Sequence, residues 1–542
     1  MKRCPQYRRD YFDDTLSFCL EDGSALIQGL SGIHSTQPPS FDSPTMIHST
    51  TAPDSEPPTS FLHVNANRVS NESAIAVLPF TNMSRDEDAE YLSDGLAEEL
   101  LNVLSKIKGL RVAARTSAFS FKGKQVSVEE IGRSLHVRSV LEGSVRSAGK
   151  RVRISVQLVD VSDGYHLWSQ TYDRTLDDIF AIQDDIAASV VEEVRSRLFD
   201  KDADPSLSRQ VKVEIADAVK DRAGDPEAHR LMLLGRHLVF RQTPEDLKRA
   251  VDHFERALAI DSRSPQCWIE LGTVSLHQAS DGLIEPARGF GRSKECADRA
   301  LSITNDFAAA HALLARILIV VEFDFTGAYE AAHMAVKSEP ENPYALHACG
   351  LISRALGRYA ESEKMYRRVT EIDPLNLGAY GGLGATLWFS GRLDEAESCY
   401  RKVLELSSHS ISMPAFLSLV LLEQGRIEEA RAEADKETTP TWKGWAKAII
   451  ENAAGRPDEA RKLLDEYIQE FSDTGQIQIA EIYSKMGLPD KAFEHLELAL
   501  ATRDPGIGGM VSSPLFRPLY SDARYKPFLR KIGIPEEYWP KS

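Results

Sequence analysis

The sequence has no long apolar run, and positive charge is in short supply. The apolar segment from Ile317 to Val321 is far shorter than the ~18 residues that a membrane-spanning helix needs. The first residues, MKRCPQYRRDYFDD, carry charges but no apolar stretch typical of a signal peptide. We therefore expect no integral membrane segment and a cytoplasmic location. The net charge of −17 argues against general nucleic-acid binding, because phosphate neutralisation needs a positive surface.

The common catalytic motifs are also missing. There is no Walker loop, no GxSxG elbow and no kinase motif set, and the 14 histidines form no HExxH or other ligand pair at a diagnostic spacing. Asp94, Glu98 and Glu99 gather at the start of a predicted helix, where carboxylates favour the helix dipole. We therefore expect a protein that is not an enzyme, with no catalytic residues, no cofactor and no bound metal.

Cysteine is scarce, with six in 542 residues. Four of them lie on predicted helices, and we expect them to be small core residues of a protein in a reducing compartment rather than disulfide partners: Cys267, Cys296, Cys349 and Cys399.

The other two cysteines, Cys4 and Cys19, stand in segment 1–30. This segment resembles short bacterial zinc-ribbon openings of the form CPxC followed by FCxxDG. Tyr7 occupies the place of the second knuckle cysteine, and structural zinc takes four ligands, so only carboxylates such as Asp22 remain to complete a shell. We predict a degenerate ribbon without stoichiometric zinc. Residues 31–72 are rich in Ser, Thr and Pro, which predicts a flexible tether without a core.

Residues 73–200 show the pattern of a mixed α/β domain. An apolar strand at 73–80 is followed by a helix at 91–107, a second strand at 110–116 and a short helix at 127–135, which Ser127 and Glu130 open as a capping box. The segment from Val137 to Arg174 alternates in period two and predicts a three-stranded meander, before a helix at 179–198.

These residues also carry a family resemblance. IAVLPFTNMS, YLSDGLAEELLNVLSKIKGL and VLEGSVRSAGKRVRISVQLVDVSDGYHLWSQTYDR resemble the bacterial TolB-like N-terminal domain. That resemblance implies a mixed α/β fold and no catalytic role. A cluster of basic and aromatic residues lies on the meander: Arg146, Lys150, Arg151, Arg153, Tyr165 and Trp168. This cluster leaves two interpretations open, a nucleic-acid platform or, as we favour, a solvated strand face.

The rest of the chain is organised by a spacing of 34 residues. Gly357, Gly391 and Gly425 open the phrases GRYAES, GRLDEA and GRIEEA. Two amphipathic helical patterns meet at each phrase, and such a pair must stack on copies of itself to bury its apolar face. The pattern resembles the tetratricopeptide repeat (TPR). It predicts about seven repeats over 225–505, after a connecting segment at 201–224 and before a capping segment at 506–542.

In the TPR family the first helix of each pair lines a concave groove. By that register, the resemblance places Tyr344, His347 and Arg354 on the groove in one repeat, and Trp388 and Phe389 in the next. An Arg beside aromatic rings could hold the carboxylate or backbone of an extended peptide. The alternative for Trp388 is packing between repeats. We expect a scaffold or adaptor for proteins or peptides, or else a regulatory subunit acting on a separately encoded cyclase, kinase or transcription factor.

Overall fold

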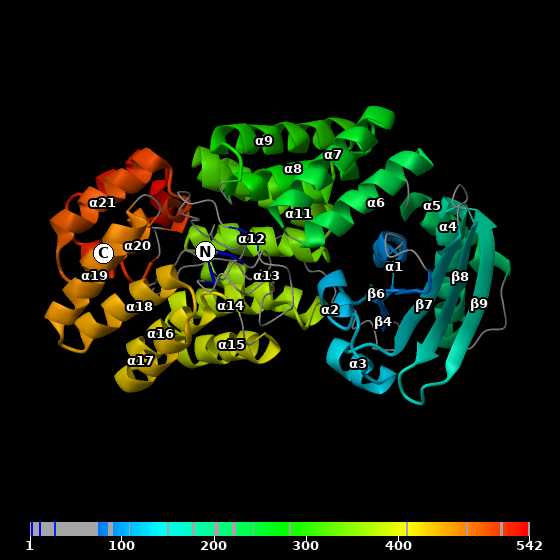
Figure 1. Cartoon of the computed structure of the whole chain (residues 1–542), viewed down its shortest axis with the longest axis horizontal. Coiled ribbons are helices and arrows are strands. Elements are labelled where there is room, and N and C mark those ends of the chain that lie inside the picture. Colours follow the sequence, from blue (N-terminus) through cyan, green and yellow to red (C-terminus); the bar gives the residue numbers. More distant parts are fainter. Residues whose placement is uncertain are drawn as a thin grey trace, which may run out of the picture. The chain divides into compact units, whose positions relative to one another are not determined.

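The computed structural model describes most of the chain from residue 74 onward (Figure 1). Near the start it describes three two-residue strands, β1 (Lys2–Arg3), β2 (Asp10–Tyr11) and β3 (Ile27–Gln28), in an antiparallel sheet of order β2-β1-β3. The predictions for Cys4, Tyr7, Cys19 and the tether at 31–72 lie outside the described residues. From residue 74 onward, the structure describes residues 74–84, 90–107, 109–148, 151–175, 179–199, 205–218, 224–241, 243–280, 283–407, 410–472, 475–509 and 513–539.

The chain falls into two compact units, each held together by its own internal contacts. Among the residues from 74 onward, one unit holds 77–110 and 139–305, and the other holds 74–76, 111–138 and the chain from 306 onward. None of the described helices combines the length and apolar content needed to cross a membrane.

The N-terminal sheet is mixed, as predicted. Its order is β6-β4-β7-β8-β9, and β5 pairs with β7. The first strand, β4, is short, apolar and fully buried, as expected of a strand in parallel pairing. The predicted meander is confirmed, with β7, β8 and β9 paired antiparallel in sequence order. The strands are β4 (Ala74–Val77), β5 (Thr81–Asn82), β6 (Arg111–Val112), β7 (Ser139–Ala148), β8 (Arg151–Asp160) and β9 (His166–Thr175).

Helices α1 and α4 pack against this sheet, α1 on β5 and β7 and α4 on β9. Ser127 opens α3 as predicted, because its hydroxyl accepts a hydrogen bond from the backbone N–H of Glu130 at 3.3 Å. The helices of this part are α1 (Glu90–Ser105), α2 (Arg115–Phe119), α3 (Val128–Leu135), α4 (Ile179–Phe199) and α5 (Pro205–Ala218).

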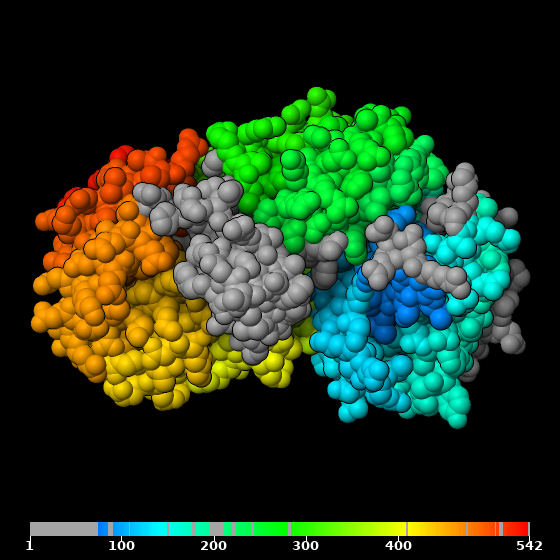
Figure 2. All heavy atoms as spheres, viewed as in Figure 1, coloured from blue at the N-terminus to red at the C-terminus, as the bar shows by residue number. Residues whose placement is uncertain are grey.

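Eight helix pairs follow among the described residues, one more than the predicted count. The first unit contains α6 (Pro226–Arg241), α7 (Pro244–Ile260), α8 (Pro265–Ser280) and α9 (Pro286–Ile303). The second contains α10 (Ala308–Ile317), α11 (Phe325–Ser338), α12 (Pro343–Ala355), α13 (Tyr359–Ile372), α14 (Leu377–Phe389), α15 (Leu393–Leu406), α16 (Met413–Glu423), α17 (Ile427–Lys436), α18 (Pro440–Ala453), α19 (Pro457–Phe471), α20 (Gln476–Lys485) and α21 (Pro489–Thr502). In the space-filling view, side chains of neighbouring pairs from α16 to α21 meet along this unit (Figure 2).

The repeated glycines end the first helix of each pair. Gly357, Gly391 and Gly425 have φ between +71° and +80°, a conformation that glycine adopts without a steric penalty. The N–H of the following arginine returns to the carbonyl five residues earlier, as in Arg392 to Leu387 at 2.9 Å. This is the Schellman arrangement that satisfies the free carbonyls of a helix end. The 34-residue period therefore corresponds to one helix pair.

Small residues allow the helices to approach closely around large rings. Tyr366 on α13 is buried against Gly350 and Gly382, and a Cβ at Gly382 would lie 2.4 Å from its ring. Tyr400 takes the same place against Gly384 one repeat later. The packing of α12, α13, α14 and α15 therefore depends on glycines facing tyrosines.

The C-terminal segment packs on two distant parts of the second unit. It comprises the short helices η5 (Pro505–Gly509), η6 (Arg517–Leu519) and η7 (Glu536–Tyr538), with α22 (Tyr525–Lys531). Phe516 and Phe528 share one apolar cluster with Phe493 of α21 and with Phe325 of α11. Arg503, which follows α21, donates to the carbonyl of Val321 at 2.6 Å. The last helix pair is therefore joined to the first pair of this unit.

Candidate functional site

The five residues predicted to line the groove differ in their exposure to solvent: two reach the surface and three are buried. Tyr344 lies in the first turn of α12 and is 69% exposed. His347, one turn later, is half-buried and meets the ring of Tyr366 edge-on, with ring centroids 5.3 Å apart. These two side chains give α12 an aromatic surface that reaches solvent at Tyr344.

The other three residues lie in the interior, which corrects their predicted place on an open groove. Arg354 is 2% exposed, and Trp388 and Phe389 are fully buried. The Arg354 guanidinium lies 5.8 Å from the Phe389 ring centroid and 5.9 Å from that of Tyr366. Its Nη1 donates to the carbonyl of Gly382 at 3.3 Å. The predicted neighbourhood of Arg and aromatic rings exists, but it is part of the packing between α12, α13 and α14.

The physical reason is the position of these residues in the repeat. Arg354 and Trp388 are 34 residues apart, so they occupy the same place in the last turn of the first helix. That turn faces the next helix pair, and Trp388 joins the large apolar core of the second unit. The alternative of packing between repeats therefore describes Trp388.

The arginine of each Gly-Arg turn forms a ladder of ion pairs. Arg392 contacts Glu395 three residues later at 2.6 Å and Glu363 of the preceding repeat at 2.7 Å. Arg426 repeats both contacts with Glu429 and Glu397 at 2.6 and 2.7 Å. Glu395 and Glu429 are exposed, whereas Glu363 and Glu397 of the preceding repeats are half-buried. Exposed pairs contribute only about 0–1 kcal/mol each. The ladder accounts for the recurrence of Gly-Arg without requiring a ligand.

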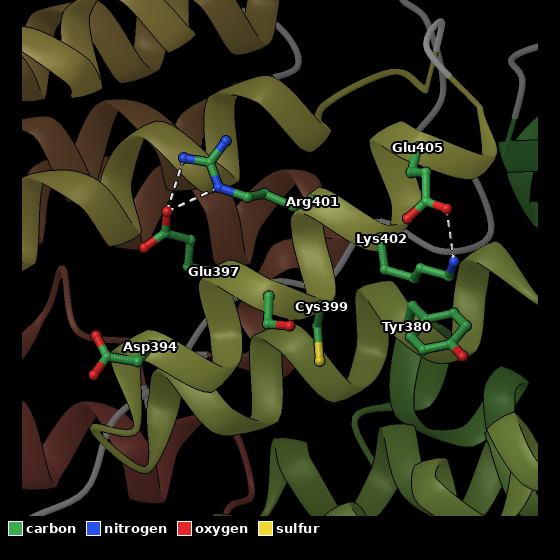
Figure 3. Close-up of a pocket in the computed structure, with 8 residues that line it drawn as sticks. Tyr380, Asp394, Glu397, Cys399, Arg401, Lys402 and Glu405 are labelled. Carbon is green, nitrogen blue, oxygen red and sulfur yellow. Dashed lines mark hydrogen bonds and ion pairs between the residues drawn. The ribbon is translucent and has the colours of Figure 1, made fainter.

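A surface hollow of about 590 Å³ lies over α15 (Figure 3). Its charged groups are already paired, since Glu397 contacts Arg401 at 2.7 Å and Glu405 contacts Lys402 at 2.9 Å. A ligand would have to break these pairs, so we assign no binding role to the hollow. Its lining is Tyr380, Asp394, Glu397, Ser398, Cys399, Arg401, Lys402 and Glu405.

Glu98 and Glu99 lie in the middle of α1 rather than at its start, which corrects the predicted position at the helix start. They have a structural partner that sequence reasoning missed. Arg236 of α6 is buried, and it contacts Glu99 and Glu270 at 2.8 Å each and Glu98 at 3.7 Å. Removing one partner of a buried pair leaves an uncompensated charge, which is strongly destabilising. These glutamates therefore hold α1, α6 and α8 together within the first unit.

The described part of the basic strand surface is solvated, as the favoured interpretation predicted, while Lys150 lies outside the described residues. Arg146 lies opposite Arg153 across β7 and β8, and Arg153 donates to Asp173 on β9 at 3.0 Å. Arg146 and Arg153 are exposed, and Tyr165 is 73% exposed. Asp173 offsets part of this positive charge, and nucleic-acid binding by this face stays an untested alternative.

Comparisons with known proteins agree with the repeats. Tetratricopeptide repeat models match residues 343–374, 377–409 and 415–436. The chain therefore combines an N-terminal mixed-sheet domain with a many-helix TPR region. The model of the HilA/YgeH-like transcriptional regulator second domain matches residues 71–189. This match does not support the TolB-like name that the sequence suggested.

One relative is "Putative adenylate cyclase 3" of Rhizobium meliloti (strain 1021), 38% identical over 203 residues. The match covers 38% of this chain, and the chain spans about a third (32%) of that protein's length. Among solved structures, yeast Tom70 is similar at 15% identity and a TM-score of 0.35, over 60% of this chain and 75% of Tom70. A TPR protein from Parabacteroides merdae ATCC 43184 has 15% identity and a TM-score of 0.37, and the match covers 48% of this chain and 98% of that protein. Such distant likenesses carry no argument about ligands.

Proposed function

We propose that this chain is a non-enzymatic interaction protein that binds a protein or peptide through its TPR region. The observation that carries the proposal is the exposed Tyr344 on α12, within a segment that matches the TPR model. Aromatic side chains supply much of the buried area at protein interfaces. The half-buried His347 lies one turn further on the same helix, so the two residues would form one contact surface.

This proposal places the partner on the N-terminal half of α12 rather than on Arg354, Trp388 and Phe389. Those three side chains are in the core, where they shape the helix pair but do not reach a ligand. The proposal also requires no cofactor and no catalytic group. It rests on surface chemistry, which is the usual source of function in a repeat array.

The test uses the tagged full-length chain and a double variant, Tyr344→Ala with His347→Ala. Partners that the wild-type chain captures from its native extract are identified, purified and titrated against both proteins. We expect the double variant to fold and to lose at least about tenfold in affinity, since truncating an aromatic hot spot costs about 2 kcal/mol or more and tenfold corresponds to about 1.4 kcal/mol. Tyr165→Ala is the matched control, because Tyr165 is similarly exposed on a different domain. Unchanged affinity of the double variant for every partner would exclude this surface.

A second candidate function is regulation of a separately encoded signalling protein. It is favoured by the match of residues 71–189 to a domain of transcriptional regulators and by the relative named as a putative adenylate cyclase. Under this proposal the captured partner is a cyclase, a kinase or a transcription factor, and its activity changes when the chain binds. A captured partner outside these classes would favour the general scaffold.

A further inference from the structure

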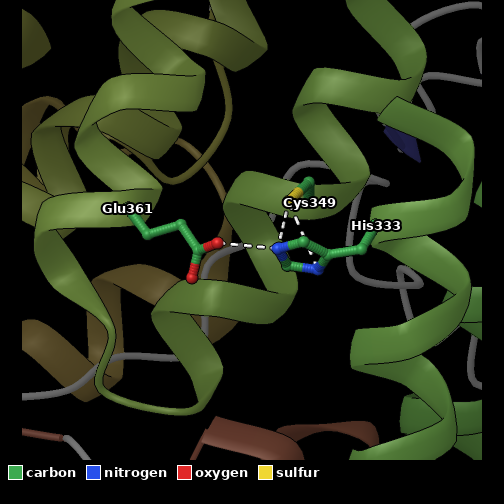
Figure 4. Close-up of side chains that lie close together, drawn as sticks. All are labelled: His333, Cys349 and Glu361. Atoms are coloured by element: carbon green, nitrogen blue, oxygen red, sulfur yellow. Dashed lines mark hydrogen bonds and ion pairs between the residues drawn. The ribbon is translucent and has the colours of Figure 1, made fainter. Parts of the chain in front are cut away.

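Three potential metal ligands converge from three successive helices of the second unit. His333 of α11, Cys349 of α12 and Glu361 of α13 place their ligand atoms within 4.8 Å of one another (Figure 4). His333 Nε2 is 2.7 Å from Glu361 Oε1, and Cys349 Sγ is 3.9 Å from the same nitrogen. Cys349 is buried, whereas His333 and Glu361 are half-buried. Water can therefore reach the side of the cluster that faces away from the thiol.

The neighbours of this cluster hold two of its members in a ligating orientation. His333 Nδ1 lies 2.9 Å from the carbonyl of Tyr329, so Nδ1 carries a proton and Nε2 faces Glu361. Cys349 Sγ lies beside the same ring, 4.0 Å from Nδ1 and 3.9 Å from Nε2. Arg358 donates to Glu361 Oε2 at 2.6 Å, which leaves Oε1 directed at the histidine. Fixing a ligand histidine through its second nitrogen is typical of zinc sites, and so is fixing a carboxylate through its second oxygen.

The repeat provides an internal comparison. Adding 34 to the three positions gives Arg367, Leu383 and Glu395, and Arg367 contacts Glu395 at 3.1 Å. A further 34 gives an arginine, a leucine and a glutamate again, at positions 401, 417 and 429. The glutamate is thus common to the three repeats, while the arginine becomes histidine and the leucine becomes cysteine in one repeat only. Both departures introduce a zinc ligand at the same place.

We propose that His333 Nε2, Cys349 Sγ and Glu361 Oε1 bind one divalent transition-metal ion of the zinc type, with water in the fourth position. A nitrogen, a thiolate and a carboxylate form a donor set that zinc accepts at tetrahedral geometry. Binding sends the Nε2 proton of the imidazolium and the thiol proton of Cys349 to solvent. The thiolate and carboxylate then neutralise the divalent ion, so Arg358 faces a site without net charge. The metal would link α11, α12 and α13.

The test is a cobalt(II) titration of the full-length chain after its metals have been removed by chelator dialysis. Cobalt is the probe because cobalt–thiolate coordination gives a near-ultraviolet charge-transfer band. We expect one cobalt per chain with this band, and competition by one equivalent of zinc. Cys349→Ala should abolish the band. His333→Gln and Glu361→Gln should each weaken affinity by at least about 10–100-fold, the loss that follows from removing even an outer-shell partner.

Two controls keep this result specific. Cys399→Ala removes a half-buried thiol one repeat away and should leave the titration unchanged. Replacing both Cys4 and Cys19 by Ser should also leave it unchanged, which separates this site from the ribbon-like segment. The proposal is overturned if the wild-type chain shows no thiolate band. It is equally overturned if the band survives in Cys349→Ala, or if it disappears when Cys4 and Cys19 are replaced by Ser.

Discussion

Glu481 on α20 is buried without a cationic partner at bonding distance among the described residues, and this predicts a pH-dependent stability. Its carboxylate accepts hydrogen bonds from the Trp445 indole N–H at 3.0 Å and from the Ser513 hydroxyl at 2.8 Å. Burial, which disfavours the charged form, raises the pKa of Glu481 to about 8 despite these two donors. We predict that Glu481→Gln removes the resulting pH dependence, because an amide keeps the shape and carries no charge.

The sign and size follow from linkage. Below pH 4.5 the carboxyl is protonated in both folded and unfolded chains, so its contribution to stability is fully present. That contribution is lost as pH rises towards 8, because the folded state must hold the proton or bury the charge. At 1.36 kcal/mol for each pKa unit, the total loss is roughly 4–5 kcal/mol, of which about 2–3 kcal/mol falls between pH 5 and pH 7.

The assay is hydrogen–deuterium exchange of peptides from α18 and α20, together with urea unfolding of the full chain at pH 5, 6, 7 and 8. Glu481→Gln should match the wild type at pH 5 and exceed its unfolding free energy at pH 7 and 8. Glu451→Gln is the matched control, since Glu451 is buried on α18 but contacts Arg431 at 2.7 Å. It should lower stability at every pH. If Glu481→Gln and wild type lose stability in parallel from pH 5 to 8, the reasoning about Glu481 is refuted.

Three further predictions concern the helix pairs. Gly382→Ala should lower the unfolding free energy by about 1–3 kcal/mol, because its Cβ would lie 2.4 Å from the Tyr366 ring. Gly381→Ala should instead raise it by about 0.5–1 kcal/mol, since the added Cβ would lie no closer than 3.7 Å from the Met413 sulfur and alanine favours a helix. Trp388→Ala should cost about 3–5 kcal/mol, as truncations of large buried side chains do. Urea unfolding measures all three, and equal effects at Gly381 and Gly382 would contradict the packing argument.

Local patterns predicted much of the fold. The meander follows from period-two alternation, and the helix turns follow from glycines such as Gly391, whose positive φ suits no other residue as well. These features depend on neighbours in sequence. The closure of the second unit does not, since Arg503 reaches the carbonyl of Val321 across 182 residues. Nothing in the spacing of the repeats specifies such a contact.

The site was harder to predict for a related reason. The family register correctly placed Arg354 beside Phe389, but it could not decide which turns of the first helix face solvent. That depends on how far the next helix pair covers α12, which is set by the glycine–tyrosine packing at Tyr366. The cluster of His333, Cys349 and Glu361 was missed because its members are 16 and 12 residues apart and match no motif.

A signal for that cluster was nevertheless present in the repeats. Positions that keep one residue type from repeat to repeat serve the packing that all repeats share, as the turn glycines do. Positions that depart in a single repeat are released from that shared role. Tyr344 corresponds to Gly378 and Ser412, and His333 corresponds to Arg367 and an arginine again at 401. In the first comparison the exposed tyrosine occurs in one repeat only, and in the second the histidine does. Aligning the repeats with one another therefore singles out Tyr344 and His333 as candidates. It does not by itself classify Trp388, because that position holds arginine at 354 and leucine at 422, and only burial assigns Trp388 to the core.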